Sequence, residues 1–362
     1  MYGEHDYEVL TSAREGLQRQ EDHFGSKQRH DTDGYNIIPF GYCTYRNRSD
    51  DGKFAFNINT ISEKAIVSKF YPVFRFTNAN SIFMAEFLNS SPRVKKKLSV
   101  LAVGTSQVVL SFEALKAAKF DLPCKDEQDK IAAFLECLNA RIENQRTLVV
   151  ALKKYKRGVV RTLLSPKHCS IKNVKWTTSR IGDIGTFIKG APLSKADISL
   201  EGTPFILYGE LYTTYSEVIS NVVRKTQASA DKQYYSQIGD VIIPTSGETP
   251  EEISTASCVM LPDIILAGDL NIYRCTQVDG RIMSYILNHV VNDRIARIAQ
   301  GKSVVHVQAA EISKIEITYP DPFSQKTIIA ILAAISDRID QSNAEFRLLH
   351  ELRKALLQKL FI

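Results

Sequence analysis

The chain carries one long segment twice. Residues 104–165 and 301–362 align without a gap at a constant offset of 197 residues, the distance from Gly104 to Gly301. Each copy has the pattern of a short strand, a turn that contains proline and a very long helix, whereas the stretches before the copies, 1–103 and 166–300, differ greatly. The matched pairs include Ser106 with Ser303, Val108 with Val305, Pro123 with Pro320, Gln128 with Gln325, Ile131 with Ile328, Leu135 with Leu332, and Leu163 with Leu360. Such a repeat predicts a pseudo-symmetric molecule, in which two alike helices carry two unlike globular units that read two different targets.

Both copies predict a helix with an apolar stripe. In the first helix, expected from about Asp126 to Leu164, apolar residues recur at steps of three and four, which is typical of a heptad seam. Tyr155 and Leu352 continue the two stripes at matched positions. Since an exposed stripe of this length would promote aggregation, we expect the helices to pack on each other as an antiparallel coiled coil. The residues predicted to pair them are Ile131, Leu135, Leu138, Ile142, Leu152, Ile328, Leu332, Ile335, Ile339, Leu349 and Leu356.

Length and composition predict more than one globular domain. The chain has 362 residues, of which 44% are hydrophobic and 24% charged, and this is too long for one ordinary core. We expect an α+β fold, in which two mixed α/β domains are separated by two long helices that form an antiparallel coiled coil with a pseudo-two-fold repeat. The predicted boundaries are a first globular domain at 1–125, a central helix at 126–165, a linker and second globular domain at 166–322, and a C-terminal helix at 323–362.

The sequence also predicts a cellular compartment. No apolar run approaches the roughly 18 residues of a membrane span, and the first ten residues lack the pattern of a secretory signal. The six cysteines are far apart and form no CxxC pair, which predicts reduced thiols rather than disulfides or a zinc site. We therefore expect a cytoplasmic protein without a membrane partner.

Motifs of catalysis are missing from the sequence. There is no P-loop, no GxGxxG after a strand, and no metal-ligand spacing among the seven histidines. The tripeptide Asp321-Pro322-Phe323 resembles the base-holding tetrad of adenine methyltransferases, but it lacks the second proline and falls where the first repeat has a plain turn. We expect no catalytic centre, no metal site and no cofactor in this chain.

The charge balance permits nucleic acid as a partner without demanding it. The formal net charge is +6, and the pI is near 8.8. Candidate phosphate-binding patches are Arg46–Arg48, Lys95–Lys97 and the run Lys153, Lys154, Lys156, Arg157 and Arg161. For each patch a solvated surface is an equal alternative.

Several local motifs, taken in their order, resemble one known family. The two ends of the first long helix, Asp126–Leu135 and Tyr155–Ser165, carry the first two motifs. Trp176 with Ile181–Gly185, and Ile317–Pro320 after Gly301, resemble the opening and the close of a recognition domain. In this order, and repeated at 197 residues, they resemble the specificity subunit of a type I restriction–modification system over nearly the whole chain.

The resemblance implies a DNA-binding subunit without a catalytic centre. Each target recognition domain would read one half of a bipartite site in double-stranded DNA, and the paired helices would act as a ruler between the halves. The helices would also dock two methyltransferase subunits, and restriction/translocase subunits would join that core. S-adenosylmethionine, ATP and magnesium would be cofactors of those partners.

Loops that follow predicted strands supply candidate DNA-binding residues. Arginine and lysine position phosphates, while hydroxyl, amide, guanidinium and carboxylate groups can read base edges. For any single residue a structural or solvated role remains the more common alternative. The candidates of the first domain are Thr11, Ser12, Arg14, Arg46, Asn47 and Arg48; those of the second are Tyr208, Glu210, Thr213, Lys225, Thr245, Ser246, Glu248 and Thr249.

The first half departs from the family pattern at its beginning. The segment Glu8–Leu10 matches Phe205–Leu207, so the counterpart of Ile181 would fall before Met1. We therefore expect a first recognition domain that is N-terminally shortened and less stable than the second.

Two alternative functions stay open at this point. A coiled-coil scaffold with two protein-binding arms would explain unlike globular units on like helices, and a fused-type methyltransferase–nuclease system could use the same specificity module. Salt dependence separates a DNA reader from a scaffold, because phosphate contacts make DNA affinity fall steeply with salt.

Overall fold

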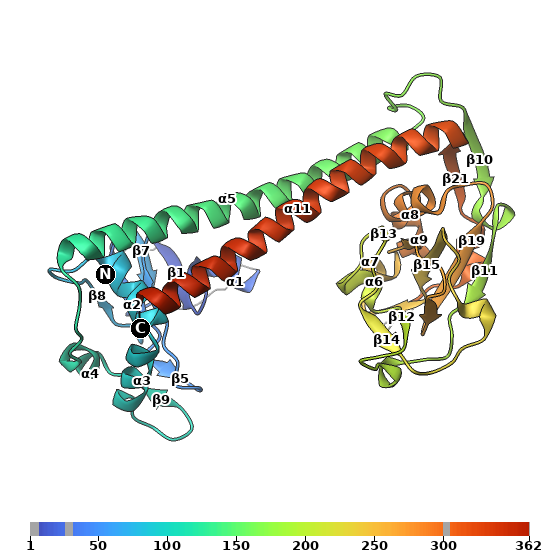
Figure 1. Ribbon diagram of the computed structural model, residues 1–362. Coiled ribbons are helices and arrows are strands. Elements are labelled where there is room, and N and C mark those ends of the chain that lie inside the picture. Colours follow the sequence, from blue (N-terminus) through green and yellow to red (C-terminus); the bar gives the residue numbers. More distant parts are fainter. Residues whose placement is uncertain (1–6, 26–31, 300–304, 362) are drawn as a thin grey trace. The chain divides into compact units, whose positions relative to one another are not determined.

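The computed structural model describes residues 7–25, 32–299 and 305–361, so Gly301 and Ser303 of the repeat lie outside the described residues. The chain divides into two compact units, one formed by Met1–Thr147 with Asn343–Ile362 and the other by Leu148–Ser342. The long helices α5 (Lys125–Leu163) and α11 (Pro322–Leu360) each contribute one half to either unit (Figure 1).

The first unit is built from small sheets covered by helices. Its strands pair in the orders β2-β1-β7-β3, β6-β4-β8 and β5-β9. Tyr45 is fully buried between Phe56 and Phe74, and its hydroxyl donates to the carbonyl of Leu110 at 2.9 Å. The elements before α5 are β1 (Glu8–Ala13), β2 (Gly16–Arg19), α1 (Gln20–Phe24), β3 (Asn36–Ile37), β4 (Cys43–Tyr45), β5 (Arg48–Ser49), β6 (Phe56–Ile58), β7 (Ala65–Val67), β8 (Val73–Phe74), α2 (Ser81–Ser90), α3 (Pro92–Leu101), β9 (Val108–Val109) and α4 (Phe112–Ala117).

The second unit has a larger central sheet in the order β11-β19-β15-β17-β13, beside smaller sheets in the orders β14-β12-β18, β16-β20 and β10-β21. The elements up to α7 are β10 (Trp176–Arg180), η1 (Ile181–Asp183), β11 (Gly185–Lys189), η2 (Lys195–Asp197), β12 (Thr203–Leu207), α6 (Glu210–Thr213), β13 (Val218–Ile219), β14 (Arg224–Thr226), η3 (Lys232–Tyr234), β15 (Asp240–Pro244), β16 (Ser246–Gly247) and α7 (Pro250–Ile253). The later elements are β17 (Ser257–Val259), β18 (Ile265–Ala267), β19 (Leu270–Cys275), α8 (Gly280–His289), α9 (Asn292–Ile298), β20 (Val305–His306), α10 (Ala309–Ser313) and β21 (Glu316–Pro320).

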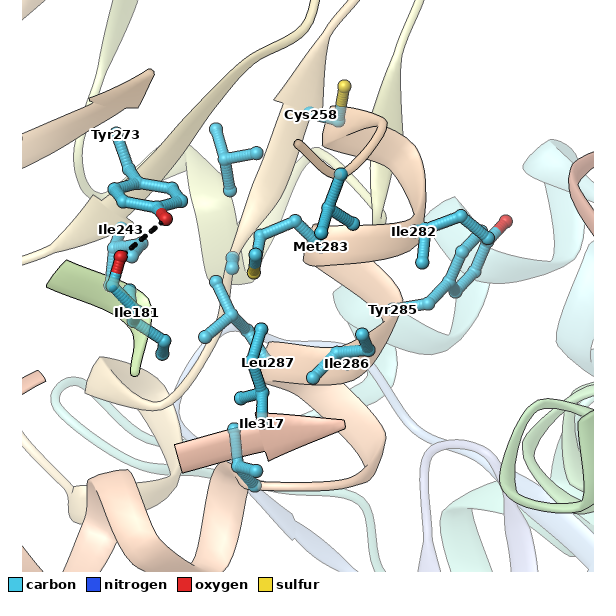
Figure 2. Close-up of a cluster of buried hydrophobic side chains, with 14 of the residues drawn as sticks. Ile181, Ile243, Cys258, Tyr273, Ile282, Met283, Tyr285, Ile286, Leu287 and Ile317 are labelled. Carbon is cyan, nitrogen blue, oxygen red and sulfur yellow. Dashed lines mark hydrogen bonds between the residues drawn. The ribbon is translucent and has the colours of Figure 1, made fainter. Parts of the chain in front are cut away.

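The main core of the second unit lies between the central sheet and α8. Ile282, Met283, Ile286 and Leu287 of α8 are fully buried there, which explains the strongly apolar face of this helix (Figure 2). Tyr273 crosses the core, and its hydroxyl donates to the carbonyl of Ile181 at 2.8 Å, which satisfies a buried polar group (Figure 2).

The structural repeat extends beyond the repeated sequence. β4 and β15, β8 and β19, β9 and β20, and α4 and α10 begin 197 residues apart. Their pairing agrees as well, since β4 joins β6 to β8 as β15 joins β17 to β19, and the parallel pair β1 and β7 corresponds to β12 and β18. β10 and β11 have no counterpart among the described residues of the first unit. The predicted α+β fold with two mixed domains and long helices is confirmed.

Matched glutamines hold the beginnings of the two long helices in the same way. Gln128 donates to the carbonyl of Pro123 at 2.9 Å and accepts from the amide of Asn80 at 3.0 Å. Gln325 donates to Pro320 at 2.8 Å and accepts from Asp279 at 2.8 Å. Asn80 and Asp279 are the N-cap residues of α2 and α8, so each glutamine ties a long helix to the domain next to it.

The helices pack on each other within each unit through the predicted stripes. In the first unit, Ala132 and Leu135 of α5 share a buried cluster with Leu357 of α11. In the second unit, Val160 of α5 shares a cluster with Leu332 of α11. In both units the beginning of one helix meets the end of the other, which makes the pair antiparallel as predicted.

The predicted stripes are wrong at Tyr155 in α5 and at Leu352 and Leu360 in α11, which are exposed. The side chains of Tyr155 and Leu352 are 60% and 49% exposed, and the next residues, Lys156 and Arg353, point inward instead. The Lys156 ammonium lies 2.8 Å from the Glu217 carboxylate and 5.2 Å from the centre of the Tyr285 ring. Each helix therefore turns a cation inward one residue after the position that a strict heptad assigns to the seam, because 3.6 residues per turn do not divide seven evenly.

The corresponding cation of the first unit is Arg353. Its Nε donates to Asn139 Oδ1 at 2.6 Å, and its Nη2 pairs with Glu86 on α2. Lys156 and Arg353 are 197 residues apart, so both repeats use a cation at the same helix position to hold the globular part of the unit, and that cation is buried in the second unit and partly buried in the first.

Candidate nucleic-acid interface

A pocket of about 940 Å³ lies beside the ends of β12 and β18 in the second unit. These two strands are parallel, so the loops that follow them emerge at the same edge of the sheet, where α/β sheets commonly bind ligands. The pocket is lined by segment 193–198, by the β12–α6 connection at 207–214, by Arg224, by Ser246–Glu248, and by Gly268 with Asp269.

The structure brings both predicted loops of this unit into the pocket. Tyr208 follows β12, Glu210 and Thr213 lie on the short helix α6, and Ser246 and Glu248 follow β15. Thr245 and Thr249 flank the second loop without lining the pocket. Two loops that are more than thirty residues apart in the sequence therefore share one site.

The Glu210 carboxylate is held inside the protein. Its Oε2 accepts from the amide of Leu207 at 3.1 Å, and its Oε1 accepts from Arg224 Nε at 3.0 Å. The side chain is only 9% exposed, whereas that of Arg224 is 49% exposed. Both carboxylate oxygens of Glu210 already accept hydrogen bonds and its side chain is largely buried, so the structure favours Arg224 as the group that faces a ligand.

Hydrogen bonds hold the second predicted loop in place. Thr249 caps α7, because its hydroxyl accepts from the amide of Glu252 at 3.2 Å, and the Glu252 carboxylate accepts from the amide of Glu248 at 2.8 Å. The Ser246 hydroxyl donates to Asp269 at 3.0 Å. The Glu248 side chain stays exposed at the pocket.

The turn after β18 contributes a site residue that the sequence analysis missed. Gly268 has a φ of +81°, and a Cβ there would lie 3.0 Å from Tyr208 Cδ1, so the turn packs closely on the tyrosine ring. Asp269 follows at the pocket wall. The Gly-Asp dipeptide between two apolar strands is a turn signal that would have revealed it.

Lys225 does not line the pocket, although the sequence analysis selected it. It lies on β14 directly after Arg224, and successive side chains of a strand point to opposite faces. The prediction identified the right strand but the wrong face.

The first unit has a pocket of about 1050 Å³ that is lined by the turn after β1, by segment 51–58, by α2 and α3, and by residues of both long helices. It shares with the second-unit pocket the turn after β1, which corresponds to the segment after β12, but it includes nothing from the segment after β7. Arg14 lies at its edge and forms an ion pair with Asp51 at 2.8 Å. The Ser49 hydroxyl, with the Lys53 amide and the Arg14 guanidinium, lowers the pKa of Asp51 to about 2. This pair is well exposed, so the Arg14 guanidinium remains available to a ligand.

The sequence predicts that Thr11 and Ser12 lie in a loop after a strand, but both are part of β1, where they pair with Gln18 and Leu17 of β2. The buried Ser12 hydroxyl accepts from the Asn57 amide group at 2.8 Å. The loop begins only at Arg14, because β1 continues longer than the short apolar run suggested.

The segment Arg46–Arg48 connects β4 to β5 and lies outside the pocket. Arg48 is on β5, and its guanidinium lies 5.5 Å from the centre of the Phe70 ring. The carbonyl of Asn47 accepts from the amide of Leu110 at 2.9 Å, and its side-chain oxygen is buried without a hydrogen-bond partner among the described residues. Arg46 is exposed.

The tripeptide Asp321-Pro322-Phe323 lies at the turn into α11. The Asp321 carboxylate accepts from the amides of Phe323 and Ser324, so the tripeptide that resembles a methyltransferase motif begins α11. All six cysteines are free. Among the described residues, no cluster of metal-ligating side chains and no helix suited to crossing a bilayer is found.

Comparison with known proteins gives one family and a shared fold. The family model described as "Type I restriction modification DNA specificity domain" matches residues 4–152 and again 173–347. A solved type I restriction–modification S subunit from M. genitalium has 16% sequence identity and a TM-score of 0.58, and the match covers 98% of this chain and 88% of that one. No curated protein matches the sequence.

A second solved structure comes from work on complex assembly and conformational transition of the type I R-M system. It has 17% identity and a TM-score of 0.57, and the match covers 92% of this chain and 84% of that chain. At such identities the likeness establishes the fold, and the family rests on the model that matches both halves of the chain.

Proposed function

Because this chain belongs to the type I restriction–modification DNA specificity family, and so selects the DNA sequence for such a system, we propose that each unit reads one half of a bipartite site through side chains at its pocket. The convergence of two base-competent loops on one pocket in the second unit is the observation that supports the proposal most directly. In the first unit the corresponding reader would be Arg14, at the end of β1.

The partners are proposed at a finer level than the family itself. We propose that α5 and α11 dock two methyltransferase subunits, and that restriction/translocase subunits join this core. Methyl transfer and cleavage would then belong to those partners, together with their cofactors. The matched halves of the helix pair support two equivalent docking surfaces, since the same residues recur at an offset of 197.

The alternative of a protein-binding scaffold is not favoured. Both globular parts fall within the DNA specificity model, whereas a scaffold would use them as protein-binding arms. The pockets also carry arginine, hydroxyl and carboxylate groups, which are the side chains that read base edges.

The test uses the full chain assembled with its methyltransferase subunits and a readout of methylated sites. Alanine substitution of Tyr208 and Thr213, or of Ser246 and Glu248, is expected to relax the second half-site by roughly 1–3 kcal/mol for each lost bidentate base contact. The first half-site should stay unchanged, and the chain without methyltransferase subunits should transfer no methyl group.

Thr186→Ala is a matched control, because Thr186 is exposed on β11 of the same unit and lies outside the pocket. Methylation motifs that remain identical to wild type in both loop variants would reject the assignment of this pocket to DNA reading.

A further inference from the structure

Arg224 is the arginine that lines the second-unit pocket, and a buried carboxylate holds its guanidinium in position. Its Nε donates to Glu210 Oε1 at 3.0 Å, and Glu210 is itself tied to the end of β12 through the amide of Leu207. The carboxylate is 9% exposed and the arginine side chain 49%, so the pair has a buried support and an accessible end. The guanidinium therefore reaches the pocket already ordered, which reduces the entropy lost on binding.

The outer edge of this guanidinium is available. Within the described part of the chain, neither Nη atom of Arg224 has a hydrogen-bond partner, and Arg224 lines the pocket. Arg274 provides the contrast, because both its Nε and its Nη2 bond to Asp240, and Nη2 also donates to the carbonyl of Tyr235. Arg274 is thus a structural residue, whereas Arg224 has N–H donors left for a ligand.

Two DNA groups offer acceptors to such a guanidinium: the O6 and N7 atoms of guanine, and the phosphate oxygens. Phosphate binding depends on net positive charge, but the Glu210–Arg224 pair is neutral as a unit. The remaining charged groups of the pocket lining are Lys195, Glu248 and Asp269, so the lining has no excess of positive charge. Directional donors without net charge suit a base edge better than a phosphate.

We propose that Arg224 is a specificity-determining residue that reads a guanine in the major groove of the second half-site, with Glu210 as its positioning residue. This inference rests on the proposed function and deepens it, because it names one reader and one base. Glu248 and Asp269, which are hydrogen-bond acceptors, would face the amino groups of neighbouring bases.

The experiment compares wild type with Arg224→Ala, Arg224→Lys and Glu210→Gln, each assembled with methyltransferase subunits. The wild-type second half-site is expected to contain a guanine at one position where Arg224→Ala accepts any base. Discrimination there should fall roughly 5- to 150-fold. Arg224→Lys keeps the charge but loses the planar guanidinium, so it should also reduce base discrimination at this position. Glu210→Gln should reduce that discrimination by a smaller factor.

Duplexes with 7-deazaguanine at that position separate base reading from phosphate binding. Loss of N7 should weaken binding of the wild type and leave Arg224→Ala unaffected. Lys225→Ala is the matched control, since this neighbour on β14 points away from the pocket, and its base preference should equal wild type.

Two results would overturn the inference. A uniform loss of affinity in Arg224→Ala, with a smaller salt slope and unchanged base preference, would identify a phosphate contact. A lower melting temperature with an unchanged motif in both Arg224 variants would identify a purely structural pair. In either case the proposed function still stands if the loop variants of Tyr208, Thr213, Ser246 and Glu248 relax the half-site, so the two failures are distinguishable.

Discussion

At the residue scale, buried charges hold each globular part to the long helices. In the second unit Glu217 lies between Lys156 of α5, at 2.8 Å, and His289 of α8, whose Nε2 lies 2.7 Å from its other oxygen. The side chains of all three are at most 14% exposed. Such a group is destabilising when one partner is removed, because the remaining charge stays buried without compensation.

Acid should therefore loosen the second unit at Glu217. Burial by itself raises the pKa of this carboxyl, but the hydrogen bond from His289 and the Lys156 charge outweigh it and lower the pKa from 4.5 to about 2. A depressed carboxyl pKa stabilises the fold above its unfolded value, and that contribution is lost as pH falls from about 4.5 towards 2. Denaturant unfolding of the wild type should show this loss, and Glu217→Gln should show a flatter pH dependence in the same window.

Lys156→Met tests the same assignment from the other side. Without the ammonium, the Glu217 pKa should rise and the acid loss of stability should move to higher pH. Glu311→Gln is a control, because its ion pair with Lys314 is exposed. If Glu217→Gln keeps the wild-type pH dependence between pH 4.5 and 2, the linkage of this carboxyl to folding is refuted.

At the element scale, α5 and α11 bury side chains at matched positions of the repeat. Ala132 and Leu135 of α5 correspond to Ile329 and Leu332 of α11 at the offset of 197, and both pairs are buried among the same kinds of neighbours. Most of the stability of a helix within a protein comes from packing of its apolar face rather than from intrinsic propensity, so the apolar stripe is expected to supply most of the stability of α5 and α11.

The stripe predicts a sharp contrast between two leucines. Leu135→Asp places a charge at a position that is fully buried, and it should lower the free energy of unfolding by about 3–5 kcal/mol. Leu352→Asp makes the same chemical change at a side chain that is 49% exposed and should cost less than about 1 kcal/mol. Urea titration followed by far-UV circular dichroism measures both, and equal losses in the two variants would mean that the seam is misassigned.

At the scale of the whole molecule, two units of the same topology carry different sequences. The strands β1 and β7 pair as β12 and β18 do, but Arg14 and Asp51 line the first pocket, while Arg224 and Glu248 line the second. Alike frameworks with unlike linings are suited to reading two different half-sites with one assembly mode.

A DNA reader of this kind should be strongly sensitive to salt. If the assembled complex contacts six or more phosphates, its affinity for target DNA should fall about 10³-fold or more between 50 and 200 mM monovalent salt. Fluorescence anisotropy over that range gives the slope of log affinity against log salt. A slope near zero would favour a scaffold that binds proteins over a DNA reader.

The sequence by itself determined the features that depend on local periodicity. Apolar residues at steps of three and four, followed by a proline, predict α5, because side chains at those steps share one helix face. The repeat at an offset of 197 residues predicts α11 in the same way. The choice of loops after β12 and β15 was also possible from turn and strand patterns.

Only the tertiary structure decided which of those groups meet and which way they point. Glu210 and Arg224 are fourteen residues apart and become partners because β12 and β14 pair, which turns a predicted base reader into a support for its neighbour. Tyr155 and Leu352 fit the stripe, but the residues that point inward are Lys156 and Arg353. Each of these cations pairs with a carboxylate from the globular part of its unit, Glu217 and Glu86 respectively. Periodicity is a property of neighbouring residues, whereas such pairings depend on segments that the chain brings together only when it folds.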